Sequence, residues 1–141
     1  MPNLDKTLVF TSWVVVEPAD DIPGLWVGHC LDLDVISQGN DPHDAIESVT
    51  EAITMTVIDD LHHGLDPTGR RAPAEFWERL AHVLKHGHQV KLSEVTGERK
   101  IVLVTQVTLV LERLQQDSTE DFSKFNVPPA TAHINSMASA A

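Results

Sequence analysis

Residues 41–64 carry the pattern that most constrains the fold, a capped amphipathic helix of about five turns. Asp41 followed by Pro42 is typical of a helix start, because the Asp side chain accepts free N–H groups and Pro needs no donor there. Asp44, three residues after the cap, can bond back toward it. Apolar residues then recur at spacings of three and four, which predicts one buried stripe: Ala45, Ile46, Val49, Ala52, Ile53, Val57 and Leu61.

Three β-strands are predicted before this helix. The segments Leu8–Val16, Leu25–Cys30 and Val35–Gln38 contain β-branched and aromatic residues and are separated by turn residues. Their short connections favour an antiparallel meander. Both alternating faces of Leu8–Val16 are apolar, so we expect this strand to be covered on both sides.

Further elements are predicted after the helix. Pro73–His86 has the pattern of a second helix, and Val90–Val95 alternates as a strand does. Residues 100–111 are so rich in β-branched side chains that we expect a long strand or hairpin there, with a buried helix as the alternative. The sequence thus predicts an antiparallel α+β fold with one domain over residues 1–114. Polar composition predicts that residues 115–141 form a flexible tail or arm.

Charge is distributed unevenly along the chain, whose formal net charge is −11. Residues 1–69 hold thirteen acidic side chains and a single lysine, whereas residues 70–114 hold eight Lys and Arg and five Glu. The first half therefore lacks the cations that a nucleic-acid surface requires. An acidic half suits a basic protein partner, although acidic surfaces also serve solubility alone.

Cysteine usage and hydropathy indicate a cytoplasmic protein. Cys30 is the single cysteine, so an internal disulfide is excluded. The N-terminus shows no basic segment leading into a long apolar run, and no apolar run reaches the about 20 residues of a membrane-spanning helix. We therefore expect neither a signal peptide nor a membrane partner.

Two groups of side chains are candidates for metal chemistry. Carboxylates at Asp32 and Asp34, or at Asp41 and Asp44, could hold Mg²⁺, but a turn and a helix cap explain the same residues. The second group is the three histidines of the second helix and its end, two of them one helical turn apart: His82, His86 and His88. Exposed helix histidines are the competing explanation, so we predict no metal site and no cofactor.

Cys30 beside His29 resembles a thiol–imidazole pair. Neighbours in a strand point to opposite faces, so we expect the two side chains to be separated and Cys30 to be buried. No residue is predicted to be catalytic, and the chain is not predicted to be an enzyme.

The segment Gly24–Ile53, with the strand before it, resembles the HicB-like antitoxin family over residues 8–65. The shared pattern is an aromatic-led strand, a Cys followed by a Leu-centred acidic turn, a short strand ending in Gly, and a capped helix opened by an acid–Ala pair. Six residues carry the structural motif: Gly28, Gly39, Asp41, Pro42, Asp44 and Ala45. Small residues here would let the helix and sheet approach closely.

The resemblance implies a β-β-β-α-β domain, extended here by residues 70–114, that forms dimers or larger oligomers. It also implies an antitoxin that occludes a small basic RNase toxin. Many family members carry a C-terminal DNA-binding motif, but the helix at Pro73–His86 is followed by a strand-like segment, so operator binding is not predicted. The alternatives are a stand-alone homo-oligomeric scaffold and a metal-dependent hydrolase using the histidine group.

Self-association is the second expectation, because an unpaired strand edge recruits another strand. If Val90–Val95 pairs with residues 100–111, the longer strand overhangs its partner. The residues expected at such an interface are Trp13, Trp26, Ile101, Leu103, Val107 and Leu109.

Overall fold

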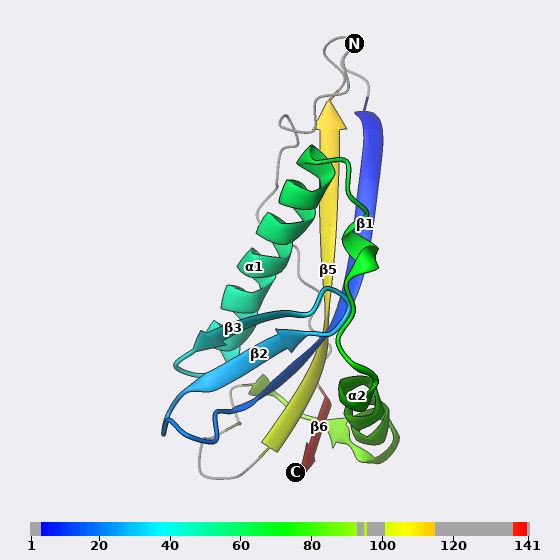
Figure 1. Ribbon diagram of the computed structural model, residues 1–141. Coiled ribbons are helices and arrows are strands. Elements are labelled where there is room, and N and C mark those ends of the chain that lie inside the picture. The colour runs from blue at the N-terminus through cyan, green and yellow to red at the C-terminus, as the bar shows by residue number, and fades with distance from the viewer. Residues whose placement is uncertain (1–3, 93–94, 96–100, 115–136, 141) are drawn as a thin grey trace.

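The computed structural model describes residues 4–92, 95, 101–114 and 137–140. Within these ranges it confirms the predicted α+β class and the predicted order of three strands followed by a helix (Figure 1). The elements are β1 Leu4–Pro18, β2 Trp26–Cys30, β3 Val35–Gly39, α1 Pro42–His62, a short 3-10 helix η1 Pro67–Gly69, α2 Ala74–His86, β4 His88–Gln89, β5 Ile101–Leu114 and β6 Met137–Ala140.

The strands form one antiparallel sheet in the order β3-β2-β1-β5-β6-β4. β1 and β5 pair over almost their whole length, from Leu4 opposite Leu114 to Val16 opposite Leu103. Because β2 pairs only with Val14–Pro18 of β1, the two long strands continue past the short ones as a two-stranded ribbon (Figure 1).

Helix α1 begins as its sequence predicts. The Asp44 backbone N–H donates to the Asp41 carboxylate over 2.7 Å, and the Asp44 carboxylate accepts the Asn40 N–H over 2.9 Å. These reciprocal bonds satisfy two N–H groups at the start of the helix. The predicted apolar stripe is buried against the sheet, with Ala45, Val49 and Ile53 fully inaccessible.

Each helix covers a different face of the sheet. Since neighbouring side chains of a strand point to opposite faces, β1 contributes to the cores under both helices. Val14 and Val16 of β1 lie in the core under α1, whereas Val15 between them lies in a second core under α2. The prediction that the first strand is covered on both sides is therefore confirmed for this part of β1.

The strand predicted at Val90–Val95 is wrong for the residues that the structure describes there. Val90, Leu92 and Val95 lie outside any strand, and their side chains pack against the core under α1. Their alternating hydrophobicity thus reflects core contacts and not a ladder. β5 takes β1 as its partner, so the overhang over Val90–Val95 does not arise.

The chain's end differs from a wholly flexible tail, because β6 pairs with the first residues of β5 and with β4. Residues 115–136 and 141, the rest of the predicted tail, lie outside the described residues. Among the helices described, none has both the length and the apolar character needed to cross a membrane.

Candidate protein-binding surface

The outward side of α1 carries a row of acidic side chains. Glu47, Glu51 and Asp59 are all exposed, and Met55 completes their four-residue spacing, so the four lie along one line of the helix. We call these four residues the α1 row. The whole helix has five acidic residues and neither Lys nor Arg. Three of the thirteen acidic side chains of residues 1–69 are therefore presented on one helix.

A shallow hollow opens beside this row. It is lined by Met55, Thr56, Ile58, Asp59 and His62. Met55 is 72% exposed and adds apolar surface to the hollow. The lining thus combines apolar side chains with the Asp59 carboxylate, a combination that suits an apolar side chain flanked by a cation.

The α1 row costs stability within the isolated chain. Like charges four residues apart on a helix, such as Glu47 and Glu51, destabilise it by about 0.2–0.5 kcal/mol per pair. Helix α1 has no Lys or Arg to pair with these carboxylates, although Nδ1 of His43 lies 3.7 Å from the Glu47 carboxylate and Nδ1 of His63 lies 3.6 Å from the Asp59 carboxylate. A basic partner would remove this repulsion.

The six motif residues form the scaffold behind this surface. A β-carbon on Gly28 would lie 3.0 Å from the Ala45 carbonyl oxygen, so the absence of a side chain lets α1 sit close to β2. Gly39 meets Ala45 in the same way at the start of the helix. Asp41, Pro42 and Asp44 form the cap.

The paired carboxylates of the β2–β3 turn have structural partners. Asp32 accepts the Trp13 backbone N–H over 2.7 Å, and Asp34 lies 2.7 Å from Nε2 of His29. Asp34 has a φ of +53°, a left-handed conformation that Asp tolerates in turns. The turn explanation is thus the one that the contacts favour for these two residues.

Cys30 and His29 point to opposite faces, as predicted. Cys30 is buried in the core under α1, while the His29 ring packs edge-on against Phe76 of α2, with 4.9 Å between ring centroids. Burial, with a smaller contribution from the nearby charge of Asp32, raises the pKa of the Cys30 thiol above its usual value of 9.0. The thiol is therefore neutral at physiological pH, and the neighbouring His29 ring lies on the other face of the sheet and does not activate it.

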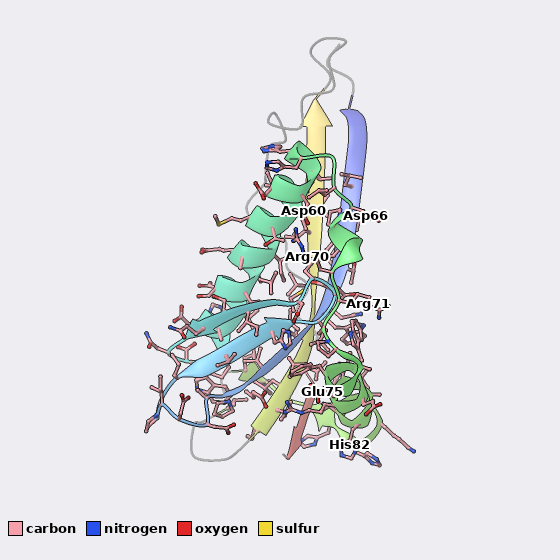
Figure 2. The ribbon with its side chains drawn as sticks, viewed as in Figure 1. Asp60, Asp66, Arg70, Arg71, Glu75 and His82 are labelled. Carbon is pink, nitrogen blue, oxygen red and sulfur yellow. The ribbon has the colours of Figure 1, made fainter. Side chains whose placement is uncertain are left out.

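The side chains of two of the three candidate histidines lie next to each other. The rings of His82 and His86 are 4.6 Å apart between centroids on the exposed side of α2, where Figure 2 labels His82. His88 follows on β4. Among the described residues, no group of three or more His, Cys, Asp or Glu is arranged to hold a metal ion.

Four of the six residues expected at an oligomer interface are in the chain's own core. Trp26, Leu103, Val107 and Leu109 are at most 4% exposed, because they face α1. Trp13 and Ile101 are only half-buried. Trp13 packs against the core under α2, and Ile101 packs against the core under α1.

Three contacts made by arginines of α2 and of the segment leading into it were not predicted from the sequence. Arg70 donates to the buried Asp60 carboxylate over 2.6 Å, and Figure 2 shows both side chains between α1 and this segment. The Arg71 guanidinium lies 4.5 Å from the Trp77 ring centre. Arg79 donates two hydrogen bonds to Glu17, at 2.6 and 3.2 Å, and this contact raises the pKa of Arg79. Glu17 and Arg79 are 62 positions apart, and the other two pairs depend on how the loop between α1 and α2 folds, so local sequence patterns carry no signal for any of the three.

No protein-family model matches the chain, and no curated protein or solved structure matches it in the same comparisons. The structure itself defines the class: an antiparallel α+β domain that holds an acidic helix on one face of its sheet. Within that class, the α1 row and its hollow are the surface best suited to a binding role.

Proposed function

We propose that this chain is a non-catalytic protein-binding module of the HicB-like antitoxin type, which uses the α1 row to bind and occlude a basic protein. The observation that supports this best is the α1 row itself, with carboxylates exposed on a helix that has no Lys or Arg. The rigid cap and the close glycine contacts fix that row relative to the sheet.

Binding would combine electrostatic steering with an apolar anchor. The acidic row raises the rate of encounter with a basic surface, and the hollow beside Met55 receives an apolar side chain of the partner. In the version that the family resemblance suggests, the partner is a small mRNA-cleaving toxin, and covering its active site blocks cleavage without any turnover. Such binding weakens as salt rises.

The test is co-expression with a short basic protein encoded beside this chain's gene, followed by co-purification and calorimetry. Reversing two acids of the row, Glu47→Lys with Glu51→Lys, should weaken binding on the order of a hundredfold, because attraction becomes repulsion at two positions. The matched control is Glu75→Lys with Glu78→Lys, which changes net charge equally at exposed positions of α2. Equal losses for both pairs would show that only net charge matters and would remove the role of the α1 row.

A further inference from the structure

Two imidazole rings lie side by side on the exposed side of α2. His82 and His86 are one helical turn apart, and their ring planes are inclined at 48° with 4.6 Å between the centroids (Figure 2). Both residues are exposed, and neither ring forms a hydrogen bond or an ion pair with another described residue. Their nitrogens are therefore open to a ligand that arrives from solvent.

The charged side chains near this pair are of both signs. Glu78 is exposed one helical turn before His82. Arg79 is held by its two hydrogen bonds to β1. Lys85 is exposed next to His86 in the sequence, but lies about 100° around the helix from it. Of the two nearest cations in the helix, one is thus engaged elsewhere and the other lies off the line that joins the two rings.

We propose that His82 and His86 chelate a divalent transition-metal ion of the class of Zn²⁺, Ni²⁺ and Cu²⁺. Imidazole suits these ions, whereas Mg²⁺ and Ca²⁺ prefer oxygen ligands. Two histidines at positions i and i+4 of a helix share a face and can bind one ion. Two nitrogens bound to one tetrahedral zinc are about 3.3 Å apart. Rotation of the two exposed side chains can reach that spacing from the observed ring separation.

This site is a surface chelate of two residues and not a catalytic centre. Within the described part of the chain, no third His, Cys, Asp or Glu joins the pair to form a larger metal-binding group, and this holds for His88 of β4 as well. Water would therefore occupy the remaining coordination positions. The site does not depend on the proposed partner binding, because α1 and α2 cover opposite faces of the sheet.

Such a chelate links metal binding to the folding of α2. The two imidazoles are one turn apart only while this part of the chain is helical, so an ion that binds both favours the helical state. No side chain caps the N-terminus of α2, while Leu80 and Val83 of this helix are buried in the core beneath it. A bound ion should therefore stabilise the helix that covers this face of the sheet.

Isothermal titration calorimetry of the full chain with ZnCl₂ tests the proposal. The matched variant carries Ala81→His with His82→Ala, which keeps all eight histidines and uses two exposed positions, but places the imidazoles five residues apart on different sides of the helix. This swap should weaken zinc binding on the order of a hundredfold, because the second ligand no longer reaches the ion. His43→Ala, which removes an exposed histidine of α1, should leave the affinity unchanged. MgCl₂ should show no binding.

Two further measurements distinguish this site from the other histidines. Electron paramagnetic resonance of the chain with one equivalent of Cu²⁺ should show two nitrogen donors in the parent and fewer in the swap. Excess Zn²⁺ should raise the thermal midpoint of the parent more than that of the swap, and circular dichroism checks that both fold. Equal zinc affinities for parent and swap would overturn the proposal, since binding would then come from other residues. A folded parent chain that binds no zinc would overturn it as well.

Discussion

Gly39 lies so close to Ala45 that the backbone nitrogen of Ala45 occupies the space that a β-carbon at position 39 would need. That β-carbon would also lie 2.6 Å from the carbonyl carbon of Asp44. The sequence predicted that small residues of the motif let the helix and the sheet approach closely. At Gly39 the structure shows this close approach between the end of β3 and the first turn of α1.

Gly39→Ala should therefore be strongly destabilising. The atoms in the way belong to the backbone of a capped helix and cannot move aside as a flexible side chain can, so we expect a loss of about 3 kcal/mol in the free energy of unfolding. Gly69→Ala is the control, because nothing lies within 4 Å of the β-carbon it would introduce. Urea denaturation measures both, and similar stabilities would contradict the close approach.

The parts of the fold that are encoded locally were predictable. The cap at Asp41 and the three-four spacing defined α1, and β-branched runs defined the first three strands. The strand that pairs with β5 was not predictable. A continuous apolar run such as Val102–Val104 indicates burial but does not indicate which other strand lies beside it. Its pairing with β1 joins segments about a hundred residues apart.

The sequence also did not indicate which apolar side chains of β5 are buried and which are exposed. From sequence, Leu103 and Val110 look equivalent, yet Leu103 is fully buried under α1 and Val110 remains half-exposed on the other side of the same strand. Only the position of the helices distinguishes them. The acidic residues of α1 were evident from composition, but the hollow that Asp59 and Met55 line together was evident only from the structure.

The ion pair between Asp60 and Arg70 predicts that substitutions of its two residues change stability by different amounts. Asp60 is 2% exposed and one of its oxygens has no hydrogen bond from any described residue, whereas the Arg70 side chain is half-exposed and can turn to water. Arg70→Ala should cost about 1–3 kcal/mol, because it leaves a buried carboxylate without its donor. Adding Asp60→Asn should recover part of the loss. Thermal denaturation of the two variants checks this, and an Arg70→Ala chain as stable as the parent would contradict it.

The buried thiol of Cys30 predicts slow chemistry and a pH effect of known sign. A neutral, inaccessible thiol should react with an aromatic disulfide reagent only after unfolding, so labelling should rise sharply with denaturant. Because folding raises the pKa of Cys30, its contribution to stability is complete below the usual thiol pKa of 9.0 and is lost as the pH rises through the folded value. The unfolded chain ionises there first.

Cys30→Ala isolates that effect. The variant should lose stability through its smaller core side chain, but the decline between neutral and alkaline pH should be shallower than in the parent chain. Denaturation midpoints measured across this pH range compare the two slopes. Parallel curves would mean that the thiol ionises equally well in the folded and the unfolded chain.

Thr105 offers a case in which removing a polar group should stabilise the protein. Its side chain is fully buried facing α1, and its hydroxyl has no hydrogen-bond partner among the described residues. Thr105→Val keeps the shape and replaces a desolvated hydroxyl with a methyl group, so the free energy of unfolding should rise by about 1 kcal/mol. Thr50→Val is the matched control, since the buried Thr50 hydroxyl donates to the Ile46 carbonyl over 2.6 Å and its removal should lower stability or leave it unchanged. A destabilised Thr105→Val chain would show that the Thr105 hydroxyl makes a hydrogen bond in solution. A buried water between Thr105 and Ser12 could act as its donor or acceptor.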